Sequence, residues 1–196
     1  MGSNAMELGW KFFHGIGRRK NHRAALHYLE HAARQGYVQA QFVLAYSYAH
    51  GLGTRKNLKL AVYWYKPAAR KLHPDALFNL ALAYDLGRGT RQDLRAAFSL
   101  YKKAALLGDR EAQCNLAIAY LEGHGTKQNL RTGIKWMERA ARKSDPKAQY
   151  NLGMAYFEGE RVNENLSRAR HWLKKAAANG HKRASAKLKR LRVSSK

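Results

Sequence analysis

The sequence repeats itself with a period of 36 residues, and the copies align along the chain without a gap. One column of this alignment is leucine throughout, at Leu8, Leu44, Leu80, Leu116, Leu152 and Leu188. Another column is glycine, at Gly15, Gly51, Gly87, Gly123 and Gly159. A period of this length is typical of stacked structural units, each too small to bury its apolar face alone. The repeat therefore excludes most folds that are built around one central core.

Each repeat carries the apolar spacing of two helices. Ala40, Leu44 and Tyr48 recur at four-residue intervals and would share one face of a first helix. Gly51 would end that helix, and Asn57 is a suitable N-cap for a second helix. We expect the first helices to begin near residues 38–40, 74–76, 110–112 and 146–148, and the sequence carries no strand pattern. The pattern predicts an all-α chain of about eleven helices in antiparallel pairs.

Paired alanines explain how neighbouring helix pairs can pack closely. They recur in the second helices, at Ala32-Ala33, Ala68-Ala69, Ala104-Ala105, Ala140-Ala141 and Ala176-Ala177. Small side chains let two helix backbones approach each other. The adjacent volume would be filled by a tyrosine column and a tryptophan column: Tyr48, Tyr84, Tyr120 and Tyr156, and Trp64, Trp136 and Trp172. Pro67 conflicts with this pattern, because it falls inside a second helix and removes one backbone hydrogen bond. We expect a bend at Pro67 and a change of curvature between the second and third helix pairs.

The fifth repeat reads AQYNLGMAYFEG over residues 148–159 and continues with Ala169, Trp172, Ala176-Ala177 and Gly180. This pattern resembles the Sel-1-like repeat, a relative of the tetratricopeptide repeat, and the resemblance covers nearly the whole chain. It implies an all-α fold, a right-handed α/α superhelical solenoid of about five repeats with a C-terminal capping helix. It also implies an adaptor for protein assembly, often bacterial, that has no catalytic residues and needs no cofactor.

Three positions depart from the pattern of that family. The second glycine of the turn between the two helices is replaced by Arg161, and the glycine after the second helix is replaced by Leu72 and by Ser144. The paired cysteines of some secreted members are missing, since Cys114 is the only cysteine. A single cysteine forms no internal disulfide, which fits a reducing compartment.

Residues 1–5 read as the remnant of an expression tag, and residues 6–196 as one repeat domain. We expect repeats at about 6–39, 40–75, 76–111, 112–147 and 148–183, with a half-repeat at 184–196 that forms the capping helix. No apolar run is long enough to span a membrane, and the sequence starts with no secretory signal. A cytoplasmic location is expected, and a periplasmic or secreted one stays open if a native signal has been trimmed. The oligomeric state is also open.

A helical wheel of the first helices, with Leu44 directed into the core, places another set of side chains on the opposite, concave side. This set combines apolar side chains with a ladder of amides: Tyr46, Asn79, Leu82, Asn115, Ile118, Asn151 and Met154. Amides pair with the backbone of an extended peptide, and apolar pockets take its side chains, so we expect peptide binding here. Two alternatives remain open. In the first, the column of Tyr46 and the neighbouring column of Phe42 merely pack against the next first helix. In the second, the asparagines bond only to local backbone.

The chain has 37 lysines and arginines against 13 acidic residues, a formal net charge of +24. Many of these cations lie in or just after the turns between first and second helices, at Arg18, Arg19, Lys20, Arg55, Lys56, Arg91, Arg95, Lys127 and Arg131. Equivalent turns occupy one edge of a stack, so these nine residues, called the basic ridge below, would lie in a row. Such a row attracts nucleic acid, anionic lipid or an acidic protein. An acidic protein is favoured because no nucleic-acid-binding motif accompanies the ridge, and a solvated surface is the alternative.

No combination of acid, base and nucleophile in the sequence points to catalysis. His27 and His31 have a spacing that can hold zinc, but no cysteine or carboxylate completes a ligand set, so we predict no metal site. Cys114 stands where other repeats have Phe78 or Tyr150, and we expect it to pack in the core. The sequence therefore favours a non-catalytic scaffold that binds a peptide or acidic protein. A polyanion-binding module is the alternative, and an enzyme ranks third.

Overall fold

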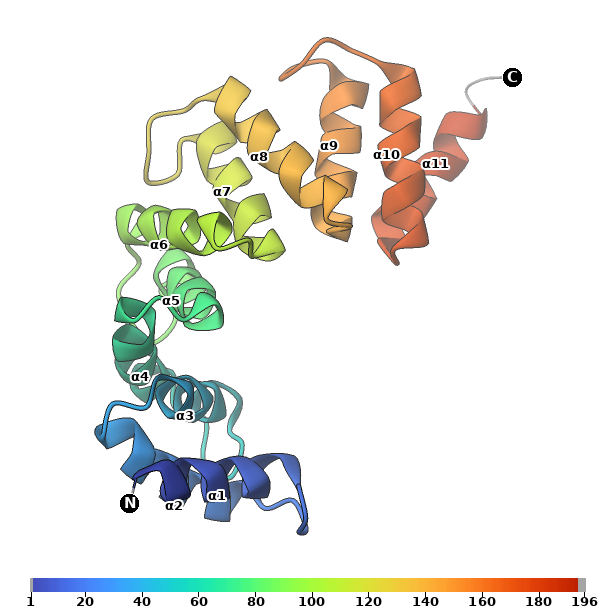
Figure 1. Cartoon of the computed structure of the whole chain (residues 1–196). Helices are drawn as coiled ribbons and strands as arrows, with labels where there is room; N and C mark the ends of the chain where they lie inside the picture. The colour runs from blue at the N-terminus through green and yellow to red at the C-terminus, as the bar shows by residue number, and fades with distance from the viewer. Residues whose placement is uncertain (1, 194–196) are drawn as a thin grey trace. The chain divides into compact units, whose positions relative to one another are not determined.

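A computed structural model describes residues 2–193 of the chain, and all regular structure in this range is helical (Figure 1). The helices are α1 (Gly2–His14), α2 (His22–Arg34), α3 (Val38–His50), α4 (Leu58–Arg70), α5 (Pro74–Leu86), α6 (Leu94–Leu106), α7 (Arg110–Glu122), α8 (Leu130–Arg142), α9 (Pro146–Glu158), α10 (Leu166–Ala178) and α11 (Lys182–Val193). The all-α repeat fold predicted from the sequence is confirmed, with eleven helices in the described range.

The chain divides into two compact units, Met1–Ala104 and Ala105–Lys196, called unit 1 and unit 2 below. In unit 1, each helix from α1 to α4 packs against the next one, and Tyr101 of α6 bonds to Asp85 of α5. In unit 2, each helix from α7 to α10 packs against its successor. Consecutive helices within a repeat run in opposite directions, so each repeat is an antiparallel pair (Figure 1).

Polar side chains cap the helices where the sequence predicted helix starts. Asn57 Oδ1 accepts the N–H of Leu60 at 3.0 Å and begins α4. The equivalent acceptors for the other second helices are Asn21, Asp93, Asn129 and Asn165. The first helices of the second to fifth repeats begin at Val38, Pro74, Arg110 and Pro146. The predicted N-cap and the predicted helix starts are confirmed.

In unit 1, the turn between the two helices of a repeat has glycine at two positions. Gly51 adopts the left-handed backbone conformation, at φ 72°, and ends α3. A Cβ atom on Gly53 would collide with the backbone of His22, the first residue of α2. Gly89 lies in the same way against the backbone of Leu58, the first residue of α4. Each of these turns therefore rests on the second helix of the preceding repeat.

The core repeats in register within each unit. First helices contribute Leu44, Leu80, Leu116 and Leu152, and second helices contribute Leu29, Tyr65, Tyr101, Met137 and Leu173, all at most 4% exposed. Burial of a side chain of this size stabilises the fold by about 1.5–3 kcal/mol. The helices approach closely where one partner is small. A Cβ atom on Gly133 of α8, for example, would lie 2.7 Å from Cγ of Leu121 in α7.

Buried glutamines join consecutive repeats, a feature that the sequence analysis missed. Gln41 Nε2 donates to the carbonyl of Ala33 at 3.1 Å, and Gln149 Nε2 donates to the carbonyl of Ala141 at 3.0 Å. Gln113 makes the same bond one repeat before Gln149. Each acceptor belongs to the last turn of a second helix, where few helical donors remain. The recurring glutamine in one column was the signal available in the sequence.

Three sequence expectations concern the chain ends and Pro67. α1 begins at Gly2 and Ala5 is buried, so the described part of segment 1–5 belongs to a packed helix, while its origin as a tag stays a prediction. The expected helix near the carboxyl end is α11, whose Ala184 is fully buried, and residues 194–196 lie outside the described range. α4 continues through Pro67, and the expected bend stays a prediction.

Substitutions at Gly133 of α8 and Leu121 of α7 test whether the two helices approach closely because one side chain is small. In Gly133→Ala the new methyl group must displace Leu121, so we expect a loss of about 1–3 kcal/mol in the free energy of unfolding. Leu121→Ala combined with Gly133→Ala recreates the Ala49 and Ala61 pair of unit 1. In the Leu121→Ala background Gly133→Ala should stabilise the chain by up to about 1 kcal/mol, because alanine is the better helix former. A double-mutant cycle by urea unfolding measures the effect of Gly133→Ala on the free energy of unfolding in both backgrounds, and this effect should change sign. An equal loss in both backgrounds would contradict the contact between Gly133 and Leu121.

Candidate functional site

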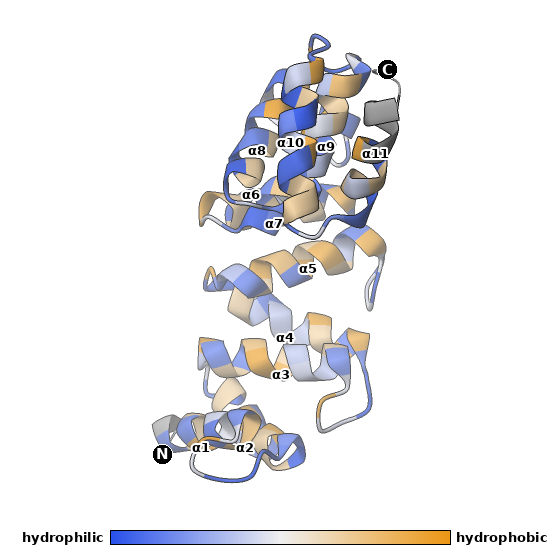
Figure 2. Ribbon diagram, turned by 90° about the vertical axis from the view of Figure 1, so that its right-hand side faces the viewer, coloured by the Kyte–Doolittle hydropathy of each residue, from blue (hydrophilic) through white to orange (hydrophobic). Residues whose placement is uncertain are grey.

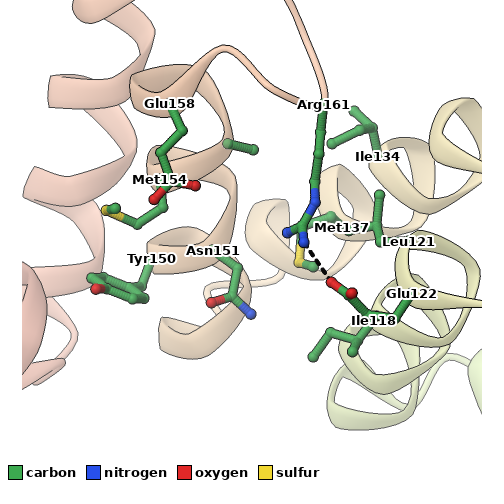
Figure 3. Close-up of a pocket in the computed structure, with 11 residues that line it drawn as sticks. Ile118, Leu121, Glu122, Ile134, Met137, Tyr150, Asn151, Met154, Glu158 and Arg161 are labelled. Atoms are coloured by element: carbon green, nitrogen blue, oxygen red, sulfur yellow. Dashed lines mark hydrogen bonds and ion pairs between the residues drawn. The ribbon is translucent and has the colours of Figure 1, made fainter. Parts of the chain in front are cut away.

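Both units contain a pocket between a helix pair and the next first helix. The unit 1 pocket has a volume of about 500 Å³ between α3, α4 and α5, and the unit 2 pocket has a volume of about 320 Å³ between α7, α8 and α9 (Figure 3). Lining residues 72 positions apart are equivalent: Ala49 and Leu121, His50 and Glu122, Val62 and Ile134, Tyr65 and Met137, Asn79 and Asn151, Leu82 and Met154, Ala83 and Ala155. The repeat therefore forms the same pocket in each unit with different side chains.

The structure places the seven side chains predicted for the concave face at half-buried positions. Five of them line the two pockets, Asn79 and Leu82 in unit 1 and Ile118, Asn151 and Met154 in unit 2. Tyr46 is not a lining residue, but its ring stacks on the lining residue His50 with centroids 4.0 Å apart. Asn115 lines neither pocket, and its Oδ1 accepts from Lys147 Nζ at 3.2 Å.

The asparagines of the predicted amide ladder have different partners. Asn79 Nδ2 donates to the carbonyl of Asp75 in its own helix at 2.7 Å. This bond agrees with the alternative in which the asparagines bond to nearby backbone. Asn151 makes no side-chain hydrogen bond within the described range and lines the unit 2 pocket. Val43, at the equivalent position one repeat before Asn79, is buried. Asn151 is thus the member of the ladder for which neither amide atom has a partner within the described range, whereas Asn79 and Asn115 each use one amide atom.

The column that begins at Phe42 packs against the next first helix. Phe42 stacks on His73 with ring centroids 4.4 Å apart, and Tyr150 stacks on His181 at 4.3 Å. Both imidazoles cap the following helix, and burial lowers the pKa of each. Cys114, in the same column, is 1% exposed, and burial raises the pKa of its thiol to about 12. The expected packing of Cys114 is confirmed, because the side chain is inside the core.

The unit 2 pocket has mixed charge and an apolar floor. Arg161 Nη2 lies 2.5 Å from Glu122 Oε1, and this ion pair joins the turn after α9 to the end of α7 across the pocket (Figure 3). Met137, Met154 and Ile118 supply the apolar side chains. Arg161 stands where other repeats have the second turn glycine, so the departure from the family pattern adds a charged contact here.

The unit 1 pocket differs in charge and in one buried polar group. His50, Lys56 and Arg88 line it, and none of its lining residues is acidic. The hydroxyl of Tyr65, a lining residue that is 3% exposed, has no hydrogen-bond partner among the residues that the structure describes. Burial raises the pKa of Tyr65, with smaller contributions from Tyr46 and Asp75, so its hydroxyl remains a proton donor.

The nine residues of the basic ridge are exposed. Seven of them lie in turns that are hydrophilic over most of their length, and Arg95 and Arg131 lie in the first turns of α6 and α8 (Figure 2). Within unit 1, Gly53 and Gly89 hold successive turns against the preceding helix pair, so the unit 1 members of the ridge lie on one edge. None of the nine takes part in the ion pairs found within residues 2–193. Arg18 contacts the ring of Phe12, with 4.5 Å between its guanidinium carbon and the ring centroid.

The described residues offer neither a metal-binding cluster nor a helix that could span a membrane. No cluster of three or more His, Cys, Asp or Glu side chains with a geometry for a metal ion occurs among them. His31, from the pair considered for zinc, lies 3.1 Å from the amide nitrogen of Gln35. None of the helices in this range combines the length and the apolar character that a membrane span requires.

A pair of tyrosine substitutions tests the unsatisfied hydroxyl of Tyr65. Tyr101, its equivalent one repeat later, donates from its hydroxyl to Asp85 Oδ2 at 3.1 Å. Tyr101→Phe loses this bond, so we expect a decrease of about 1 kcal/mol in the free energy of unfolding. Tyr65→Phe loses no bond and should leave that free energy unchanged or raise it. Urea unfolding of both variants makes the comparison, and equal losses would show that the Tyr65 hydroxyl has a partner.

The chain matches the family model described as Sel1 repeat over residues 5–37, 38–71, 74–109, 110–145 and 146–181. The crystal structure of a Sel1 repeat protein from Oxalobacter formigenes is 31% identical, with a TM-score of 0.87 over 94% of this chain and 73% of that one. The protective antigen c5321 of uropathogenic Escherichia coli, which displays an SLR fold, is 28% identical, with a TM-score of 0.91 over 96% of this chain and 40% of that one.

Cysteine rich protein B of Helicobacter pylori is 22% identical and shares the fold, with a TM-score of 0.53 over 67% of this chain and 94% of that one. The comparison with curated proteins found no match. The five family matches are consecutive and cover most of the sequence, and they agree with the helix pairs of the structure. The chain belongs to the Sel1 repeat family.

Proposed function

We propose that this chain is a non-catalytic scaffold whose first helices bind an extended, acidic peptide segment of a protein partner. Sel1 repeat proteins generally act as protein-interaction scaffolds, and the family is generally non-enzymatic. The surface proposed for recognition is the one expected to be concave, where the first helices carry Asn79, Leu82, Asn151 and Met154.

The recurrence of one pocket in both units is the observation that carries this proposal. Extended peptides bind through their backbone to amides, while alternate side chains enter separate pockets. Each unit offers an asparagine beside an aliphatic lining side chain, Asn79 with Leu82 and Asn151 with Met154. Both volumes, about 500 Å³ and about 320 Å³, are large enough for one peptide side chain and lie within the range of ligand pockets.

The charge balance supports an acidic partner. A net charge of +24 raises the rate of encounter with acidic segments and disfavours basic ones. Lys56 belongs both to the basic ridge and to the lining of the unit 1 pocket. The ridge and the pocket would therefore act together on an acidic segment.

Asn115→Ala with Asn151→Ala tests the peptide surface. We expect the double variant to weaken binding about tenfold, mainly through the lost amide of Asn151, with unchanged helicity because neither side chain is in the core. The probe is the tightest-binding peptide from a library of nonapeptides, measured by fluorescence anisotropy, with circular dichroism as the folding check. Asn163→Ala, at an exposed turn position, is the matched control. Unchanged affinity in the double variant would remove the asparagines from the binding surface.

Exposed cations without ion pairs in the described range support a second candidate, polyanion binding through the basic ridge. This candidate predicts that a short DNA duplex binds at about 50 mM salt and loses most of its affinity by about 200 mM. Neutralising Arg55, Lys56, Arg91 and Arg95 by glutamine should weaken that binding further. The measurement is a filter or anisotropy titration across the salt range, and absence of binding at low salt rejects the candidate.

A further inference from the structure

We propose that the unit 1 pocket binds the carboxylate of a glutamate or aspartate side chain, with the Tyr65 hydroxyl as hydrogen-bond donor and Lys56 and Arg88 as the flanking cations. This inference rests on the proposed function, because it assigns one residue class of the bound peptide to one pocket.

The buried hydroxyl of Tyr65 lacks an acceptor within residues 2–193. A buried polar group without a partner costs about 1–3 kcal/mol, so such groups are rare unless a ligand completes them. The next repeat shows the acceptor that this position uses, because Tyr101 donates to the carboxylate of Asp85. One repeat before Asp85 stands Ala49, which lines the unit 1 pocket. The carboxylate that the chain supplies at Asp85 is therefore missing at Ala49, and the pocket has room for one.

The charges that line the unit 1 pocket also favour a carboxylate. His50, Lys56 and Arg88 line the unit 1 pocket, and its lining set includes no carboxylate. The charge of Asp75 contributes to the raised pKa of Tyr65, but Asp75 is exposed on the first turn of α5 and does not line the pocket. Hydrogen bonds between charged partners are about twice as strong as neutral ones, so a carboxylate gains more here than an amide does.

The two cations of the unit 1 pocket, Lys56 and Arg88, both lie in turns between helices. Lys56 lies in the turn that precedes α4. Arg88 follows the C-cap Gly87 of α5, and the next residue, Gly89, rests on the backbone of Leu58 in α4. Both cations thus come from turns whose positions are fixed by contacts with α4 or its cap, at the same edge of unit 1.

The remaining lining favours an amino-acid side chain over a bare anion. Leu58, Val62 and Leu82 supply apolar surface beside the cations. The methylene groups of glutamate can contact this surface while the carboxylate reaches the Tyr65 hydroxyl. In the unit 2 pocket, Met137 replaces Tyr65, and the cation Arg161 is paired with Glu122. That pocket has no buried donor in need of an acceptor, so the preference for an acid is specific to unit 1.

The experiment uses two pools of fluorescent, acetylated and amidated nonapeptides with random flanks and either Glu or Gln at the centre. Wild type should bind the Glu pool at least about tenfold more tightly than the Gln pool. Tyr65→Phe and Lys56→Gln with Arg88→Gln should reduce this ratio to about twofold or less. Lys59→Gln with Arg70→Gln removes the same charge at exposed positions outside both the pocket lining and the basic ridge, and should keep the ratio. Fluorescence anisotropy at fixed salt measures all four proteins.

Ala49→Asp supplies the missing carboxylate within the chain, as Asp85 does for Tyr101. It should raise the unfolding temperature and abolish the preference for the Glu pool. Equal binding of the two pools by wild type, or an unchanged ratio in Tyr65→Phe, would overturn the pocket assignment while peptide binding stands. Failure of wild type to bind either pool would overturn both the assignment and the proposed function.

Discussion

Close contact between helices at small residues is the constraint on which the rest of this structure depends. Where alanine or glycine faces a large side chain, as Gly133 faces Leu121, two backbones approach and the leucine columns are buried in register. Because the repeats share this register, the side chains that the core does not use return to equivalent positions. Both pockets are consequences of that register, since their lining residues fall in the same columns.

Within this constant frame, a few core positions decide the chemistry of each pocket. Tyr65 with Ala49 leaves a buried donor beside an open space, whereas Tyr101 with Asp85 closes a hydrogen bond inside the protein. Two repeats after Tyr65 the same column holds Met137, and the pocket there is apolar at its floor. Variation at core columns thus changes recognition while the helix pairs keep their arrangement within each unit. A family that shares one fold can in this way provide different binding surfaces.

The sequence predicted those features that depend on local or periodic information. Helix starts, the Asn57 cap and the buried leucine column follow from spacing, and five of the seven concave residues do line pockets. The pattern did not reveal that Tyr65 lacks a partner, because its column reads as ordinary core. The ion pair between Glu122 and Arg161 was also missed, since it joins the end of α7 to the turn after α9, in different repeats, and follows no column. Such contacts depend on side-chain geometry that a period alone does not contain.

The central claim is that equivalent positions on the first helices of each unit form the recognition surface. Chemical-shift mapping of the ¹⁵N-labelled chain, with a bound peptide from the glutamate pool, tests it most directly. The account predicts that the largest shifts fall on pocket-lining residues of the first helices, among them Asn79 and Leu82, and on the adjoining turn residues Lys56 and Arg88. It predicts little change at exposed second-helix residues such as Tyr63 and Lys174. Shifts confined to those second-helix residues would contradict it.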